Sequence, residues 1–233
     1  TINAGGTFTA NVRATGVAGA GYVVGGYGTT SPISSYGNFV FNVTGNAVTS
    51  VPITTGTQKP FITITSAFTS YAGSLTLNAN VTGGKGGIWV KTGGVSAYRD
   101  VTFNSSSTSA DASIQIDNPV ISTNGNVSIS GTGVTSIGVA ATATGDITGS
   151  KITINGSSTG AAAATTAAVS LVGNNITVNT VANASYAASM QNAVSITGNI
   201  VTKGNAGINS TAIITNNAIG GGISFVTNGD LSQ

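Results

Sequence analysis

The chain has 233 residues, of which seven are Lys or Arg, five are Asp and none is Glu, His or Cys, so only 5% carry a charge. The lack of His and Cys excludes Ser-His-Asp triads, cysteine nucleophiles and conventional zinc, haem or iron–sulfur sites, and we expect no metal or cofactor. A net charge of +2 gives no basic face for nucleic acid. The sequence contains no run of about 18 apolar residues, the length that a membrane-spanning helix requires.

Residues 1–60 do not follow the regular spacing found later in the chain. Counting back one 13-residue interval from Ile62 reaches Thr49, with Val51 as its only apolar partner. The segment also contains half of the Tyr residues and a Gly- and Tyr-rich stretch at 16–36. The open end of a repeat needs a cover because it is an unpaired sheet edge. We therefore predict either a cap or irregular rungs with a Gly/Tyr-rich excursion at 16–36.

From residue 62 onward, two apolar residues separated by one other residue recur every 13 positions. The residue after each pair is polar, which is the period-2 pattern of a strand with one face turned inward. The six pairs are Ile62/Ile64, Leu75/Leu77, Ile88/Val90, Val101/Phe103, Ile114/Ile116 and Val127/Ile129. Ile116 should therefore point inward and Gln115 outward. Ile116→Asp should then lower the stability of the fold strongly, whereas Gln115→Asp should leave it nearly unchanged.

After Ile129 the interval lengthens but the pattern continues. The next pairs, Ile152/Ile154 and Ile176/Val178, follow at intervals close to twice the earlier one. A rung made of two half-units, with a period of about 24–26 residues, accounts for both parts of the chain. Gly and Asn dipeptides that favour turns lie between the pairs, and no segment has the stripe of an amphipathic helix.

A β-rich repeat of this length predicts an all-β, elongated solenoid. We expect a right-handed parallel β-helix with about 24–26 residues per rung, regular over residues 61–233. The handedness itself is not encoded in the spacing. An antiparallel β-sandwich is the alternative, because strands at the shorter interval also suit a meander.

Several segments resemble the degenerate repeats of a known family. The segments lie at residues 73–79, 125–131, 150–156 and 222–231. They are similar to repeats of the filamentous-haemagglutinin-type adhesins, which Gram-negative bacteria export by two-partner secretion. Over about residues 61–233, the resemblance implies a parallel β-helix at the outer cell surface that serves attachment or biofilm formation. The family's secretion motifs are not recognisable here, so no functional residue is carried over.

Few residues could carry chemistry. The densest group of charges is Arg99, Asp100, Asp111 and Asp117. A 13-residue half-unit would stack Asp117 on Asn104 and Lys91. Two carboxylates at a suitable separation could act as acid and base on a polysaccharide, as in lyases and hydrolases built on β-helices. Because the same charges suit solubilising positions beside strands, we expect no enzyme and keep a lyase or hydrolase as the alternative.

The single Trp, Trp89, falls on an outward position between Ile88 and Val90. One interpretation is that a loop covers it. The other is that it is exposed and stacks on a sugar or inserts into a partner.

The repeat pattern predicts a rigid and nearly neutral rod, and the resemblance implies a structural and adhesive extracellular protein at the bacterial outer cell surface. The strand expected at 222–229 lies close to Gln233, and no capping helix or charge cluster follows it. We therefore expect end-to-end contact with further β-helix of the same chain or with identical subunits. A host or matrix glycan or protein is a further expected partner, whose identity the sequence does not specify.

Overall fold

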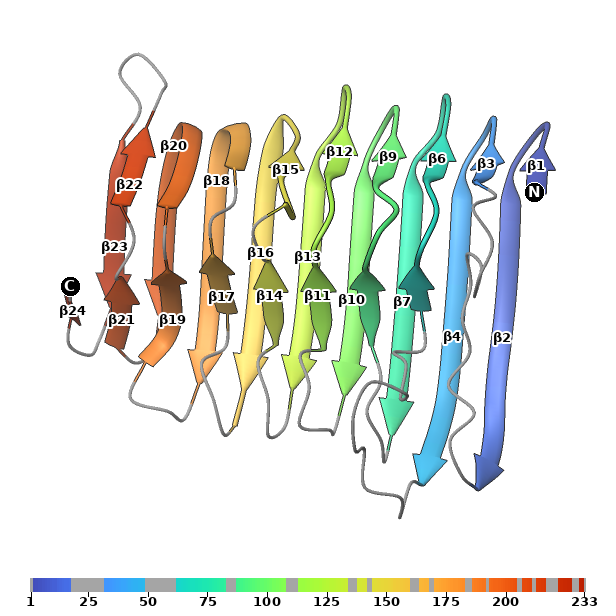
Figure 1. The fold of residues 1–233 in the computed structure, drawn as a ribbon, viewed down its shortest axis with the longest axis horizontal. Helices are drawn as coiled ribbons and strands as arrows, with labels where there is room; N and C mark the ends of the chain where they lie inside the picture. The colour runs from blue at the N-terminus through green and yellow to red at the C-terminus, as the bar shows by residue number, and fades with distance from the viewer. Residues whose placement is uncertain are drawn as a thin grey trace.

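The described part of the chain is all β, and every strand pair in it is parallel (Figure 1). The computed structural model describes residues 2–17, 32–48, 62–82, 87–107, 113–133, 138–141, 144–159, 164–167, 170–182, 186–191, 193–204, 207–210, 213–216, 222–227 and 231–232. Over these ranges no helix is long and apolar enough to cross a membrane.

The strands form three stacks that run along the molecule. The first stack contains short strands: β1 (Ile2–Ala4), β3 (Ile33–Ser35), β6 (Phe68–Ser70), β9 (Val95–Ala97), β12 (Val120–Ser122) and β15 (Ile147–Thr148). The second contains longer strands: β2 (Phe8–Val17), β4 (Phe39–Val48), β7 (Leu75–Thr82), β10 (Val101–Ser107), β13 (Val127–Gly133), β16 (Lys151–Ser158), β18 (Ser170–Ala182), β20 (Ala193–Gly204) and β23 (Ile223–Thr227).

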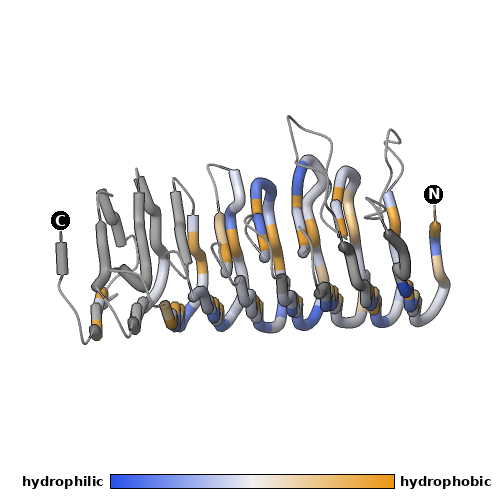
Figure 2. The backbone as a smooth tube through the Cα atoms, turned by 90° about the horizontal axis from the view of Figure 1, so that it is seen from below, coloured by the Kyte–Doolittle hydropathy of each residue, from blue (hydrophilic) through white to orange (hydrophobic). Residues whose placement is uncertain are grey.

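The third stack is a separate sheet: β5 (Ile62–Ile64), β8 (Ile88–Val90), β11 (Ile114–Ile116), β14 (Val139–Ala141), β17 (Ala164–Ala167), β19 (Tyr186–Gln191), β21 (Gly207–Ser210) and β24 (Leu231–Ser232). The first two stacks join at β18, which pairs with both β15 and β16. β22 (Ile213–Asn216) pairs with the first part of β20. Successive coils therefore lie side by side along the long axis (Figure 2).

The pairing register confirms a parallel β-solenoid with about 24–26 residues per coil. Asn104 of β10 is in register with Asn78 of β7, which is 26 residues earlier in the chain. Asn104 to Ser130 is again a step of 26 residues, and the two coils after it are slightly shorter, because Ser130 to Asn155 is a step of 25 residues and Asn155 to Asn179 a step of 24 residues. The antiparallel β-sandwich is therefore wrong. The 13-residue interval in the sequence is the alternation between the second and third stacks within one coil.

The described residues before position 61 contribute β1 to β4 to the first and second stacks. Their coils are longer, because the register from Asn11 to Asn42 is a step of 31 residues and that from Asn42 to Asn78 a step of 36 residues. Most of the Gly/Tyr-rich stretch at 16–36, namely residues 18–31, lies outside the described residues. The boundary at residue 61 and the choice between a cap and an excursion stay predictions.

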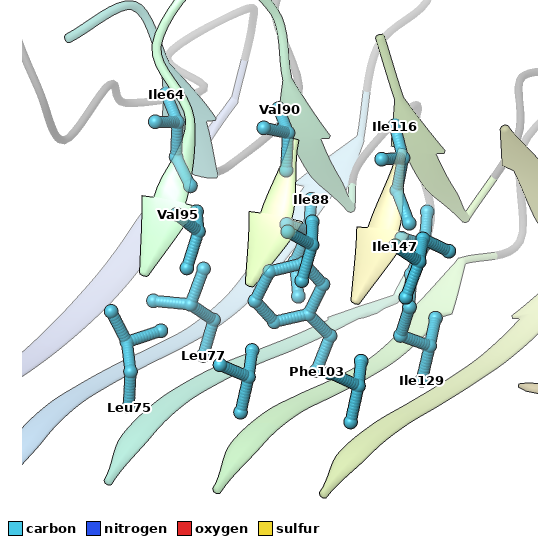
Figure 3. Close-up of a cluster of buried hydrophobic side chains, with 14 of the residues drawn as sticks. Ile64, Leu75, Leu77, Ile88, Val90, Val95, Phe103, Ile116, Ile129 and Ile147 are labelled. Atoms are coloured by element: carbon cyan, nitrogen blue, oxygen red, sulfur yellow. The ribbon is translucent and has the colours of Figure 1, made fainter. Parts of the chain in front are cut away.

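The core is the space enclosed by the three stacks. All twelve residues of the six predicted pairs are buried, with at most 1% of each exposed, which confirms the assignment of strand faces. In Figure 3, Ile64, Val90 and Ile116 form one row, and Leu77, Phe103 and Ile129 form a second row facing it. Each buried side chain of this size stabilises the fold by about 1.5–3 kcal/mol. The same kind of apolar contact therefore repeats between successive coils and stabilises their stacking.

Aromatic packing extends this core toward the N-terminal coils. The rings of Phe8 and Phe39 are stacked with centroids 5.0 Å apart, and Phe39 and Phe68 are tilted at 5.2 Å. Such pairs contribute about 0.5–1.5 kcal/mol beyond the area that they bury. The larger rings of Phe8 and Phe39 fill the first coils in the place that Leu75 and Val101 take later.

Candidate functional site

The predicted group of charges is divided between two turns. Arg99 and Asp100 follow β9, whereas Asp117 precedes β12, and β9 and β12 are paired along their length. Asp100 and Asp117 therefore lie at opposite ends of this strand pair. The Asp100 carboxylate accepts a hydrogen bond from the backbone N–H of Asn126 at 2.8 Å. Asp111 lies outside the described residues, so its place in the group stays untested.

The predicted stacking of Asp117 on Asn104 is wrong. Asn104 belongs to β10 in the second stack, where it pairs with Asn78 and Ser130. Asp117 follows β11 of the third stack, and its backbone N–H donates to the carbonyl of Val90 at 2.9 Å. The 13-residue half-unit does not superpose strands, since only a full coil returns to the same stack. Lys91, which follows Val90, does occupy the corresponding turn one coil earlier.

Trp89 points outward from β8 and is half-buried among polar side chains. Its indole N–H donates to Asp117 Oδ2 at 2.6 Å. The Gln115 amide, which is in register with Trp89, donates to both oxygens of the same carboxylate at 3.1 and 3.0 Å. The Lys91 ammonium lies 4.8 Å from the ring centroid, a cation–π distance. The Asp117 carboxylate thus orients the ring and its neighbours.

Replacing Asp117 by Ala is expected to lower the free energy of unfolding by about 1–2 kcal/mol, because the Trp89 N–H and the Gln115 amide lose their acceptor in a half-buried site. Trp89 is the only Trp, so its fluorescence emission should shift to longer wavelength as the ring becomes mobile and wetter. Asp117→Asn keeps an acceptor oxygen and should retain most of both properties. An unchanged emission spectrum in Asp117→Ala would contradict this role.

A ladder of side-chain amides follows the outer face of the second stack. Each amide belongs to the residue that directly follows an inward-facing side chain, and it donates to the coil before it. The donor–acceptor pairs are Asn42 to Asn11 at 2.7 Å, Asn78 to Asn42 at 2.7 Å, Asn104 to Asn78 at 2.9 Å, Asn155 to Ser130 at 3.1 Å, and Asn179 to Asn155 at 2.9 Å. From β7 to β13, the outward side chains beside the ladder are Thr, Asn and Ser.

Ser130 is the one short member of this ladder between Asn104 and Asn155. We expect Ser130→Asn to raise the free energy of unfolding by about 1 kcal/mol, because its amide can donate to Asn104 Oδ1 and accept from Asn155 Nδ2. Ser128→Asn, on the same strand, faces Thr102 and Thr153 instead and should give no such gain. Urea unfolding of the two variants compares them directly. Equal stabilities would show that completing the amide ladder at position 130 does not stabilise the fold.

Three exposed tyrosines, which the sequence analysis did not single out, gather at one corner. Tyr36, Tyr71 and Tyr98 directly follow β3, β6 and β9, the short strands whose arrowheads lie near the top of Figure 1, and are 63%, 60% and 48% exposed. The last residues of these strands are in register, so the tyrosines occur once per coil. The signal in the sequence is a recurring four-residue motif: Ile-Ser-Ser-Tyr, Phe-Thr-Ser-Tyr and Val-Ser-Ala-Tyr. We call these residues the tyrosine row.

Comparison with known proteins adds no relative. No protein-family model, no curated protein and no solved structure matches the chain. The chain is defined by its class, the parallel β-solenoids, and by the surfaces described above. The resemblance to filamentous-haemagglutinin-type repeats stays a prediction.

Proposed function

We propose that the chain is a rod segment of a large adhesin or extracellular filament at the bacterial outer cell surface. In this proposal it belongs to the filamentous-haemagglutinin type exported by two-partner secretion and serves attachment or biofilm formation. The observation that supports the proposal is the continuous stack from β2 to β23, in which each coil pairs in parallel with the next. Such a stack can be lengthened readily, because each added coil needs only its neighbour for stability.

The surface chemistry is also suited to a rod exposed to the extracellular medium. From β7 to β13, the outer face of the second stack is covered by hydrogen-bonded Asn side chains and by Thr and Ser, and only 5% of the chain is charged. Backbone and side-chain hydrogen bonds both run along the axis. Stability therefore depends little on ionic strength, because surface ion pairs are the interactions that salt screens.

End-to-end contact with further β-helix of the same chain, or with identical subunits, completes the proposed rod. β1 and β2 form the outer edge of the described strands in the first and second stacks, and Ile2 is 44% exposed there. A further parallel coil would pair with this edge and cover Ile2. A host or matrix glycan or protein is the proposed target of attachment, and we propose no role in nucleic-acid binding.

We further propose that the chain is not an enzyme. Asp100 and Asp117 lie at opposite ends of the β9–β12 pair, and each carboxylate accepts hydrogen bonds that fix local structure. The test is incubation with polygalacturonate and with neutral glycans, followed by an assay for new chain ends. Product formation that Asp117→Asn abolishes would overturn the proposal in favour of the polysaccharide lyase or hydrolase.

Attachment is tested with beads coated with the purified chain and applied to epithelial cells and to bacterial biofilms. We expect several-fold more bound beads than with an albumin coating. Beads coated with the core variant Ile116→Asp serve as a folding control, since its composition is otherwise unchanged, and should bind at the albumin level. Equal attachment of all three coatings would refute the adhesive function.

A further inference from the structure

We propose that the tyrosine row binds an uncharged polysaccharide that lies along the axis of the rod. The inference rests on the proposed adhesive function and deepens it, because it names the class of ligand and the corner of the solenoid that binds it. It is carried by the exposure of Tyr36, Tyr71 and Tyr98, by their fixed register and by the uncharged character of their surroundings.

Backbone hydrogen bonds fix the position of each tyrosine relative to the preceding coil. Each tyrosine N–H donates to a backbone carbonyl of the coil before it. The acceptor of Tyr36 is Ala4 at 2.9 Å, that of Tyr71 is Ser35 at 2.9 Å, and that of Tyr98 is Ser70 at 3.0 Å. Neighbouring parallel strands lie about 4.8 Å apart. The row therefore presents one aromatic side chain per coil at a regular interval along the axis, and little ordering of the backbone is needed on binding.

A buried hydroxyl braces the turn that carries the second tyrosine. The Ser70 side chain donates to the carbonyl of Gly37 at 2.7 Å and accepts from the N–H of Gly73 at 3.2 Å. Ser122 makes the same two types of bond two coils later, to the carbonyl of Arg99 at 2.6 Å and from the N–H of Gly125 at 2.9 Å. The corner is thus a rigid edge rather than a set of independent loops.

The exposed rings match the chemistry of a sugar polymer. Each tyrosine offers an apolar ring with a hydroxyl at its tip, and a pyranose offers an apolar C–H face with hydroxyls at its rim. Among the described aromatic residues, contacts between rings join only Phe8, Phe39 and Phe68, so the three tyrosine rings do not cover one another. Exposed rings in a row are uncommon on a surface that has no partner.

The charge and the size of the tyrosine row favour an uncharged polysaccharide over an anionic polymer or a folded protein. The charged side chains in the described turns that carry the tyrosines are Arg99 and Asp100, which are adjacent and opposite in sign. An anionic polymer therefore finds no surplus of positive charge along the row. A stable interface with a folded protein needs about 800 Å² on each partner, more than three side chains on one corner supply. An extended neutral chain needs only the row.

The proposal is tested by affinity electrophoresis of the full chain in gels that contain hydroxyethyl cellulose, soluble β-1,3-glucan, dextran or polygalacturonate. We expect at least one of the three neutral polymers to retard the chain more than polygalacturonate does. The triple variant Tyr36→Ser, Tyr71→Ser, Tyr98→Ser should lose at least tenfold in affinity. The triple Tyr→Phe variant keeps the rings and should bind within threefold of the original chain. All three positions are exposed, so both variants should keep the circular dichroism spectrum.

Three results would overturn the proposal: retardation by none of the neutral polymers, stronger binding to polygalacturonate, or unchanged binding by the Tyr→Ser variant. If the triple Tyr→Ser variant has an altered circular dichroism spectrum, the single variant Tyr71→Ser replaces it in the test. This single variant must then bind the neutral polymer more weakly than the original chain does. The bead assay separates this proposal from the adhesive function. If beads coated with the Tyr→Ser variant attach as before, adhesion stands and the tyrosine row is not its site. If no coating attaches, the adhesive function itself fails.

Discussion

Replacing Ile116 by Asp is expected to lower the free energy of unfolding by at least about 4 kcal/mol, a large part of the roughly 5–15 kcal/mol that stabilises a typical protein. Ile116 is 0% exposed and lies in the row with Ile64 and Val90 that faces Ile129 across the core (Figure 3). A carboxylate there would be buried without a partner, and its loss of hydration is not compensated. Urea unfolding followed by far-ultraviolet circular dichroism measures the effect.

Ser128→Asp is the matched control for this substitution. Ser128 points outward from β13 between Thr102 and Thr153, so a carboxylate there stays in water and should change stability by no more than about 0.5 kcal/mol. Gln115→Asp is less suitable than the sequence suggests, because the Gln115 amide donates to Asp117 and a carboxylate would repel it. If Ile116→Asp and Ser128→Asp unfold at the same urea concentration, the inward and outward faces are wrongly assigned.

Gly131→Ala is expected to cost about 2–3 kcal/mol although it adds a single methyl group. Gly131 occupies an inward position near the end of β13, where the interior is narrow. A Cβ there would overlap the carbonyl oxygen of Gly138 and come within 2.8 Å of its carbonyl carbon and 2.9 Å of Val139 Cγ2. Backbone atoms at the start of β14 cannot move aside without disturbing the pairing of this strand with β11 and β17.

Gly6→Ala is the control for this effect. A Cβ at Gly6 meets no atom within 4 Å, so the substitution should be neutral or slightly stabilising through the unfolded chain. Thermal unfolding of both variants under the same conditions gives the comparison. If the Gly131→Ala variant has the same melting temperature as the original chain, the interior at this position is wider than described.

The buried faces could be predicted from the sequence because strand periodicity leaves little choice. Side chains alternate between the two sides of a strand, so Ile62/Ile64 or Val101/Phe103 can enter the core only together. Their repetition at equal intervals then requires the strands to stack. The same argument predicted the outward position of Trp89.

The contacts between coils could not be predicted with the same success, because they depend on which residues share a stack. A 13-residue step placed Asp117 on Asn104, whereas the full coil places Asp117 beside the turn of Lys91. The tyrosine row was missed for a related reason. The interval from Tyr36 to Tyr71 is longer than that from Tyr71 to Tyr98, since extra residues between β4 and β5 hide a register that the strands preserve.

The same nearest-neighbour pairing determines how the molecule should respond to tension. When the chain is pulled from one end of the stack, only the outermost coil is loaded at its free edge, and its release exposes the next coil to the same load. A regular coil such as that from Asn78 to Asn104 holds 26 residues. At about 3.3–3.6 Å per residue, one released coil extends to about 90 Å. Single-molecule stretching should therefore lengthen the chain in repeated steps of that size.

A single rupture of the whole stack would contradict coil-by-coil peeling. A rod that yields in this way dissipates a sudden pull in small increments, while the coils that are not yet loaded stay folded and paired.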